Sequence, residues 1–203
     1  MYWLFFAYLA IGYFYPAAGI VALICMLAPV LIAPFKGRYW CGNYCPRGSL
    51  YDNLLSRFSP RKPIPAFFRT LGFRTFMVAF IMTVFSVQMY YAWGNWDEMG
   101  LVFLRIIFIT TVVGIVLGLI YNHRTWCSFC PMGTMASWLT RKTAKPLNVE
   151  PTCVSCKLCT KACPFDLTPY DAKGTSTGYT HNDCLKCEKC VAACPKQSLT
   201  FKS

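Results

Sequence analysis

Charged residues are scarce in this sequence, and acidic residues are the scarcest of them. Only 14% of the 203 residues are charged, whereas 56% are hydrophobic, and soluble domains average roughly 25% charged residues. This balance excludes an ordinary soluble domain and a disordered chain. The sequence also contains no Cys-x-x-Cys-His haem site, no glycine-rich nucleotide fingerprint and no P-loop. The usual sequence signals for binding haem, dinucleotides and nucleoside triphosphates are therefore missing.

The basic residues lie beside apolar stretches. Lysine and arginine outnumber aspartate and glutamate by 20 to 8, which gives a net charge of +12. Eight basic residues accompany a single acid, Asp52, between positions 36 and 74, and four more lie between 122 and 146 with no acid. A nucleic-acid-binding protein would carry such an excess on its soluble part. The distribution instead indicates a membrane protein with no nucleic-acid partner.

Three apolar segments are long enough to cross a bilayer. The first 35 residues contain no charge, and as a helix they would exceed the roughly 30 Å hydrocarbon core but would fall short of two spans. We predict spans at about 19–35, 73–93 and 101–121, with an aromatic lead-in that ends near Pro16. A signal peptide is not expected, because the sequence has no basic start and the apolar run is too long.

The basic residues also predict the orientation. Cytoplasmic loops are enriched in lysine and arginine, so both basic segments are expected on the cytoplasmic side. The loop 94–100 contains Asp97 and Glu98 and no basic residue, which is typical of the outer side. A multi-pass protein of the cell membrane is predicted, with its N-terminus outside and its C-terminal region in the cytoplasm.

Eight of the thirteen cysteines form a tandem repeat near the C-terminus. Each copy has the spacing Cys-x-x-Cys-x-x-Cys-x-x-x-Cys-Pro, which is typical of bacterial ferredoxins. Three closely spaced cysteines can ligate one [4Fe–4S] cluster, while the cysteine before proline ligates the cluster of the other copy. We therefore assign one cluster to Cys153, Cys156, Cys159 and Cys194, and the second to Cys184, Cys187, Cys190 and Cys163.

Zinc binding and a disulfide framework are the alternatives for these eight cysteines. Zinc sites commonly use paired cysteines, and runs of four that end in Cys-Pro fit them poorly. The inferred cytoplasmic side disfavours disulfides. The sequence thus predicts an α-helical membrane domain with about three transmembrane helices over residues 1–146. An α+β ferredoxin-like domain with two [4Fe–4S] clusters is predicted over residues 147–203.

A second repeat lies beside the membrane segments. The run Trp-Cys41-Gly-Asn-Tyr-Cys45-Pro-Arg-Gly recurs as Trp-Cys127-Ser-Phe-Cys130-Pro-Met-Gly. Each copy follows a span that runs in the same direction, so a pseudo-twofold axis along the membrane normal would bring the four cysteines together. They could then hold a third iron–sulfur cluster, either [2Fe–2S] or [4Fe–4S]. Thiol–disulfide chemistry, binding of another metal such as copper, and a purely structural role stay open. Cys25 is expected to be a small buried residue of the first span.

This combination of spans, Trp-Cys…Cys-Pro-x-Gly motifs and a twin ferredoxin tail resembles the NapH/MauN-type membrane-bound ferredoxins. Related modules occur in the maturation flavoprotein of nitrous-oxide reductase and in the copper-handling protein of cbb3-oxidase assembly. The resemblance implies a membrane unit that passes electrons between quinone or a cytoplasmic donor and partner redox subunits, with all twelve motif cysteines as ligands. The chain departs from the family in having three spans where members often have four, which leaves open any quinone site that depends on the extra helix.

The sequence favours an electron-transfer subunit over a self-sufficient enzyme. No residue pattern offers a substrate pocket with a base or a nucleophile, whereas a relay needs only clusters in a suitable environment. A metal-reducing or metal-handling assembly factor that uses the membrane cysteines directly is the alternative, and a stand-alone quinone oxidoreductase is a third hypothesis. The expected partners are the bilayer and other redox subunits of a membrane complex.

Overall fold

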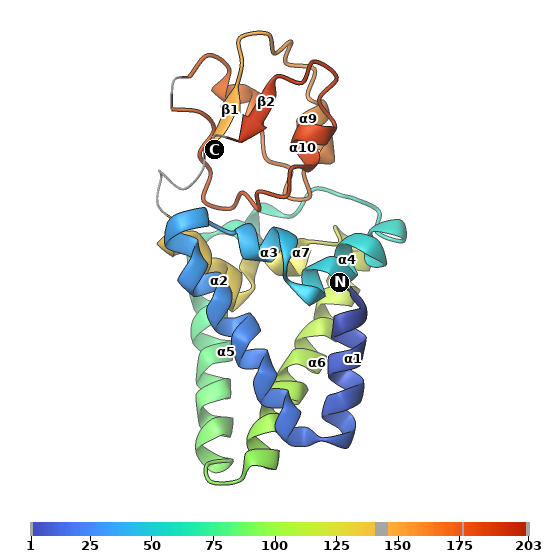
Figure 1. Ribbon diagram of the computed structural model, residues 1–203, viewed down its shortest axis with the longest axis vertical. Helices are drawn as coiled ribbons and strands as arrows, with labels where there is room; N and C mark the ends of the chain where they lie inside the picture. Colours follow the sequence, from blue (N-terminus) through green and yellow to red (C-terminus); the bar gives the residue numbers. More distant parts are fainter. Residues whose placement is uncertain (1, 141–145, 176, 202–203) are drawn as a thin grey trace.

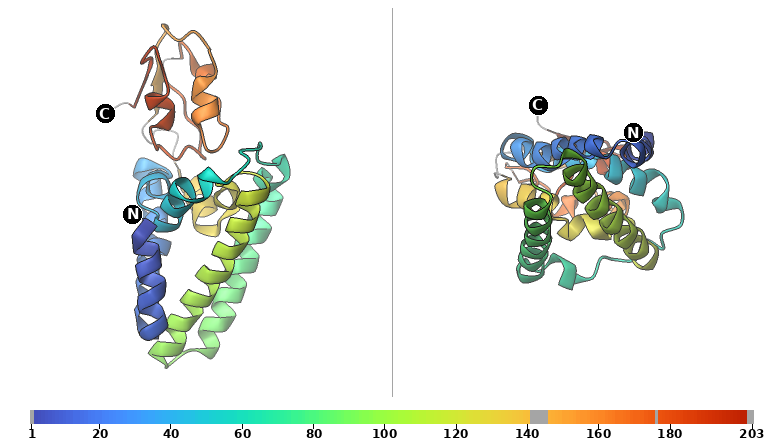
Figure 2. Two further views of the ribbon diagram at one scale, coloured as in Figure 1. Left: turned by 90° about the vertical axis from the view of Figure 1, so that its right-hand side faces the viewer. Right: turned by 90° about the horizontal axis from the view of Figure 1, so that it is seen from below.

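A computed structural model describes residues 2–140, 146–175 and 177–201 as a bundle of apolar helices with a small domain on one end (Figures 1 and 2). Three helical segments are long and apolar enough to cross a membrane: Pro16–Lys36, Leu71–Tyr91 and Trp96–Ile120. The first combines the 3₁₀ segment η1 (Pro16–Val21) with helix α2 (Ala22–Lys36), and the others are α5 and α6. The three predicted spans are therefore confirmed to within a few residues.

The N-terminal segment differs from the expected aromatic lead-in. Residues Tyr2–Phe14 form helix α1, which runs antiparallel to α2 and begins beside α4 (Pro46–Asn53), at the end that carries the cysteine motifs (Figure 1). The chain reverses after α1 at Pro16, which lacks an N–H donor and starts η1. Phe5 is buried against Leu50 of α4. The sequence predicts the N-terminus on the side of the membrane opposite the C-terminal domain, whereas in the structure α1 begins at the same end of the bundle as that domain.

The helical part consists of two similar units. The first unit is α1, α2, α3 (Tyr39–Asn43) and α4, and the second is α5, α6, α7 (Thr125–Phe129) and α8 (Pro131–Leu139). Each unit is a hairpin of apolar helices followed by a one-turn helix and a helix that begins with proline. Contacts between α1 and α4 have their counterpart between α5 and α8, and α8 also packs on α2. The short 3₁₀ helices η2 (Leu55–Arg57) and η3 (Ala66–Arg69) connect the units.

The C-terminal domain is closed by a small antiparallel sheet. Strand β1 (Leu147–Val149) pairs with β2 (Leu199–Phe201), so the start and the end of the domain lie side by side. Between the strands lie α9 (Leu158–Ala162), the 3₁₀ helix η4 (Pro169–Ala172) and α10 (Lys189–Ala192). The architecture is the predicted one of a helical apolar domain followed by a small α+β domain.

The backbone of this domain repeats as closely as its cysteines do. Among residues 146–175 and 177–201, six residues other than glycine have positive φ. They form three pairs with equivalent places in the two cysteine motifs: Ser155 and Lys186, Lys157 and Glu188, and Asp166 and Gln197. Positive φ is strained for such residues and tends to occur at functional sites. The repeated backbone conformation indicates that the two cysteine loops have the same function.

Two glycines allow the closest contact between the apolar helices. The backbone of Gly19 in η1 lies against that of Gly100 in α6, and a Cβ atom at Gly19 would overlap the carbonyl of Gly100. A Cβ atom at Gly100 would overlap the carbonyl of Pro16. Small residues of this kind let membrane helices approach at backbone distance.

We predict that Gly100→Ala destabilises the bundle. The added methyl has no room, and overpacking costs about 1–3 kcal/mol, which exceeds the gain of up to about 1 kcal/mol in helix propensity. Gly72→Ala is the matched control, because nothing lies within 4 Å of that position in the first turn of α5. Thermal unfolding in detergent should give a lower midpoint for Gly100→Ala only, and equal midpoints would contradict the close packing.

Candidate functional site

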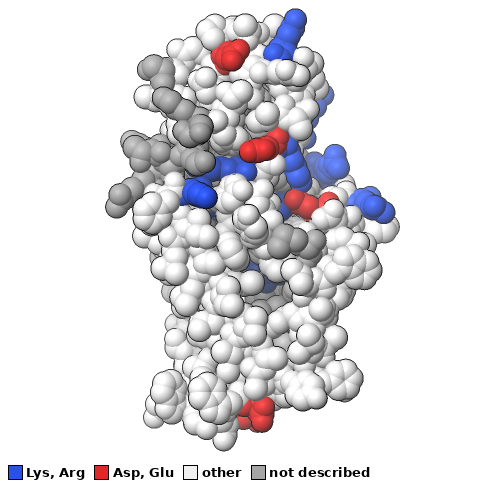
Figure 3. Space-filling view, in the orientation of Figure 1, with Lys and Arg blue, Asp and Glu red and all other residues white. Residues whose placement is uncertain are grey.

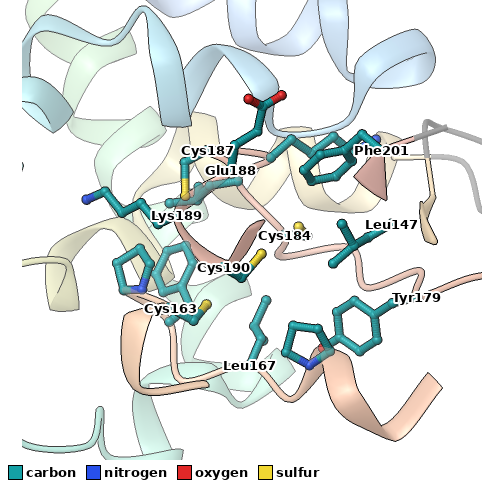
Figure 4. A pocket seen from close by; sticks show the side chains of 15 residues that line it. Leu147, Cys163, Leu167, Tyr179, Cys184, Cys187, Glu188, Lys189, Cys190 and Phe201 are labelled. Carbon is teal, nitrogen blue, oxygen red and sulfur yellow. The ribbon is translucent and has the colours of Figure 1, made fainter. Parts of the chain in front are cut away.

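Four cysteines of the C-terminal domain surround one pocket. Cys184, Cys187 and Cys190 of the second motif line it together with Cys163 of the first (Figure 4). Burial raises the pKa of Cys163 to about 11 and that of Cys190 to about 12. Thiols of this kind become thiolates when a metal binds and displaces the proton. The grouping is the crossed one that the spacing predicts.

The second group of the domain lies nearer the sheet. Cys159 is buried in a cluster with Leu147 and Leu199, and Cys153 and Cys194 pack against this cluster. Cys156 lies exposed on the loop before α9. Cys194 of the second motif therefore lies with the cysteines of the first, which is the other half of the crossed arrangement.

All four cysteines of the membrane repeat line a single cavity. The cavity has a volume of about 370 Å³ and lies where the two helical units meet, and its walls include Cys41, Cys45, Cys127 and Cys130. In each unit the first cysteine lies on the one-turn helix, and the second is the N-cap of a helix with proline at its first position. A helix N-terminus favours negative charge on such a sulfur.

The sulfur atoms of this cavity receive several N–H groups. Burial raises the pKa of Cys41 to about 12, although the nearby guanidinium of Arg38 opposes the shift. Three donors approach the other sulfurs: Gly48 N at 3.4 Å from Cys45 Sγ, Arg47 Nη2 at 3.5 Å from Cys130 Sγ, and Arg124 Nη1 at 3.7 Å from Cys127 Sγ. The cavity combines buried thiols with cationic donors, which is suited to a metal–thiolate centre that carries negative charge.

Two buried arginines link the two helical units by equivalent hydrogen bonds. Arg38 of the first unit donates to the carbonyl of Cys127 at 2.7 Å, and Arg124 of the second unit donates to the carbonyl of Cys41 at 3.1 Å. Both guanidinium groups are about 1% exposed. Equivalent bonds in both directions are what a twofold relation between the units produces, as the sequence predicts.

Asp52 balances the charge of one of these arginines. Its carboxylate accepts two hydrogen bonds from Arg124, at 2.8 and 2.9 Å, and one from Lys189 of α10 at 2.8 Å. His123 Nε2 lies 3.4 Å from the same carboxylate. Burial opposes ionisation of Asp52, but the hydrogen bonds from His123, Arg124 and Lys189 and the charge of Arg124 outweigh it and hold the pKa well below its usual range.

The second unit lacks this carboxylate, and the C-terminal domain supplies one. Counting from the glycine of each motif, Ser137 has the place that Asp52 has in the first unit. Ser137 donates at 3.0 Å to Asp183, which precedes the second ferredoxin motif. Asp183 also forms ion pairs with Arg38 at 2.9 Å and with Arg74 at 2.8 Å. Burial would raise the pKa of Asp183, but Arg38 and Arg74 outweigh it and lower the value to about 2.

The C-terminal domain is thus attached next to the membrane cavity. The carbonyl of Leu185 lies so close to Gly42 that no side chain would fit there. Phe165 and Leu185 belong to an apolar cluster that packs against the cysteines of both sites, namely Cys41 and Cys127 on the membrane side and Cys163, Cys184 and Cys187 in the domain. The pocket of Cys163 is therefore the one that faces the membrane cavity, and the group around Cys159 lies farther away.

The sequence interpretation missed several residues of this site. Arg38 and Arg124 stand two residues before each Trp-Cys pair, so the repeat itself carried the signal. Asp183 carried none, because its partners are distant in sequence. Cys25 was expected to be buried, but it is exposed on α2 and lines the membrane cavity. Within the described residues, no three cysteine, histidine or acidic side chains already form a site for a single metal ion.

Comparison with protein families agrees with this arrangement. A 4Fe–4S binding domain matches twice, at residues 18–65 and 102–150, and a 4Fe–4S dicluster domain matches residues 152–199. The chain is an iron–sulfur protein of the ferredoxin type. Each of the two matches covers the Cys-Pro motif of one helical unit and all or most of the long helix before it, but not the first helix of that unit. The dicluster match covers most of the C-terminal domain. Iron–sulfur electron transfer is the activity that these domains imply.

Two curated relatives come from Methanocaldococcus jannaschii. The uncharacterized protein MJ0749 is 24% identical over 73% of this chain and 60% of its own length. The uncharacterized protein MJ0750 is 24% identical over 68% of this chain and 63% of its own length. The chain thus spans about three fifths of the length of these relatives. No solved structure matches it.

We predict that Asp183→Asn loosens the C-terminal domain. The amide cannot neutralise the buried Arg38, and breaking a buried ion pair costs about 3–5 kcal/mol. Amide hydrogen exchange of residues 183–187 should accelerate. Asp166→Asn is the control, because its pair with Arg69 is long, at 4.0 Å, and the two side chains are 36% and 31% exposed; such a pair contributes about 1 kcal/mol or less.

Adding Ser137→Asp to Asp183→Asn should restore part of the loss in thermal stability, since it returns a carboxylate to Arg38 from within the second unit. If Asp183→Asn behaves like Asp166→Asn, the ion pairs do not hold the domain in place.

A second prediction concerns the crossed arrangement. Cys163→Ser should damage the cluster of Cys184, Cys187 and Cys190, because a ligand lost from one side leaves an open iron site. The cluster of Cys153, Cys156 and Cys159 should stay comparatively intact. Electron paramagnetic resonance of the reduced protein would distinguish the two signals, with Cys194→Ser as the reciprocal variant. Damage to the opposite cluster in each variant would refute the crossing.

Proposed function

We propose that the protein is a membrane electron-transfer subunit of the NapH/MauN type, which relays electrons between a redox partner and other subunits of a membrane complex. Two [4Fe–4S] clusters would be held by the eight cysteines of the C-terminal domain, and a third cluster by Cys41, Cys45, Cys127 and Cys130. This proposal is supported by the two matches to a 4Fe–4S binding domain, each over a unit that contributes two of these four cysteines.

The charge around the membrane cavity carries the proposal. Arg38 and Arg74 share the single carboxylate of Asp183, while Arg124 and Lys189 share that of Asp52. Arg47 adds a further guanidinium to the cavity wall. Buried cations need anions, and a cubane with four thiolates carries a charge of roughly −2. The cavity therefore fits an iron–sulfur cluster in both its ligands and its charge.

The bound clusters would supply one-electron redox chemistry, and the chain supplies their surroundings. Phe165 and Leu185 keep the space between the membrane cavity and the nearer pocket of the domain apolar. The ion pairs of Asp183 and Asp52 hold the domain against the cavity. The exposed loop of Cys156 leaves the farther group accessible from solution. These features support a path through three proposed cluster sites, from the exposed loop of Cys156 to the membrane cavity.

The cysteine end is proposed to face the cytoplasm of a cell-membrane protein. Lysine and arginine side chains gather around the junction between the helices and the C-terminal domain, whereas acidic residues mark the far end (Figure 3). Those acids are Asp97 and Glu98, in the first turn of α6. Positive charge is typical of the cytoplasmic side. Because α1 begins at this end, the N-terminus would also lie on the cytoplasmic side.

Quinone is a proposed partner on the membrane side. An apolar groove of about 570 Å³ lies between α1, α4 and α6. Phe5 lines both this groove and the cysteine cavity. A hydrophobic carrier in the groove would thus lie next to the proposed third cluster. Partner redox subunits would complete the path, and lipid would cover the remaining apolar faces.

A metal-handling assembly factor is the second candidate. Cys25, Met26 and Met132 line the same cavity as the four motif cysteines, and thiolate and thioether ligands suit Cu(I). In this alternative the membrane cysteines would bind or reduce a transported metal, while the domain clusters deliver electrons.

Iron content decides between the two candidates. We predict about twelve irons per chain in anaerobically purified protein, or about ten if the third cluster is [2Fe–2S]. Serine at any one of the four membrane cysteines should remove only the iron of the third cluster. The double variant Cys41→Ser/Cys127→Ser should lose no more, because the same cluster cannot be lost twice.

Cys25→Ser is the matched control, since it alters the same cavity outside the motifs, and it should keep its iron. About eight irons in the unmodified protein, unchanged in all variants, would refute the third cluster and favour the metal-handling alternative.

A further inference from the structure

The two cysteine motifs carry different residues at a position that lines the shared cavity. The second residue of α4 is Arg47, whereas the second residue of α8 is Met132, and both line the cavity. The cysteines, prolines and glycines around them are the same in both motifs. The difference places a cation on the side of the first motif where the second motif has an uncharged thioether.

Arg47 extends from the first unit into the second. Its Nη1 donates to Thr110 Oγ1 at 2.8 Å, and its Nη2 donates to Cys130 Sγ at 3.5 Å. The guanidinium also lies over the ring of Trp126, 5.6 Å from its centre. All three contacts belong to the second unit, so the cation is held in one place against Cys130.

Arg47 also differs from the other two arginines of the cavity. Arg38 and Arg124 each form an ion pair with a carboxylate. No ion pair of Arg47 with an acidic residue occurs within residues 2–140, 146–175 and 177–201. Arginine stays protonated in proteins, so Arg47 presents a positive charge to the sulfur of Cys130.

We propose that Arg47 is a positioning residue that raises the reduction potential of the cluster held by the four membrane cysteines. Reduction adds one negative charge to the cluster, and a fixed cation that donates to a ligand sulfur stabilises the more negative state. The inference rests on the proposed third cluster. Thr110 keeps the guanidinium in place, and its partly buried position limits screening of the interaction by solvent.

Redox titration of the full chain, followed by electron paramagnetic resonance, tests the inference. In Arg47→Gln the equilibrium constant for reducing the membrane cluster should fall about tenfold, which corresponds to a potential lower by about 59 mV for one electron. Arg47→Lys should lie close to the unmodified protein. The two clusters of the C-terminal domain should keep their potentials. Arg57→Gln is the matched control, since it removes the same charge from an exposed position outside the cavity.

The outcomes separate the inference from the proposed function. If the unmodified protein contains about eight irons and no third signal, the proposed function fails. If the third signal is present and Arg47→Gln leaves its potential unchanged, the role of Arg47 is refuted. If Arg47→Gln cannot hold the cluster, Thr110→Val carries the test, because it frees the guanidinium without removing it. A smaller downward shift in Thr110→Val supports the inference, and no shift overturns it.

Discussion

Cations buried at the end of an apolar helix bundle must be neutralised, and the rest of this structure depends on that requirement. Arg38 and Arg124 are almost fully enclosed where the two helical units meet. An isolated charge in such surroundings costs several kcal/mol. The carboxylates of Asp52 and Asp183 neutralise part of this positive charge. Cysteine thiolates would neutralise the remainder when they bind a metal. Charge balance thus links the contact between the units, the attachment of the C-terminal domain and the chemistry of the cavity.

The two helical units differ at one position that decides how the C-terminal domain is attached. In the first unit Asp52 provides a carboxylate within the unit, whereas the second unit has Ser137 at that place and depends on Asp183 of the C-terminal domain. A symmetric membrane unit would need no such domain to balance its charges. The substitution therefore makes the domain part of the membrane unit and fixes which of its cysteine groups faces the cavity.

The attachment of the C-terminal domain also holds its nearer cysteine pocket at a fixed place beside the membrane cavity while the farther cysteine group stays accessible. The nearer pocket, with Cys163 and Cys184, is separated from the membrane cavity by apolar side chains, and the backbone of Leu185 rests on Gly42. The farther group keeps Cys156 exposed. The proposed electron-transfer role would need both properties, because internal transfer requires fixed spacing while a redox partner would have to reach the outermost site.

The sequence by itself determined the parts that depend on local pattern. Hydropathy gave the three long apolar helices, and cysteine spacing gave the crossed grouping of Cys163 and Cys194, because a loop of fixed length can reach only certain positions. The repeated Trp-Cys motifs pointed to the meeting of Cys41, Cys45, Cys127 and Cys130. Only the tertiary structure decided what depends on distant contacts. The position of α1 beside α4 depends on the packing of Phe5 against Leu50. The pairing of Asp183 with Arg38 joins residues 145 positions apart. Burial and charge compensation act through space, so a pattern along the chain does not reveal them.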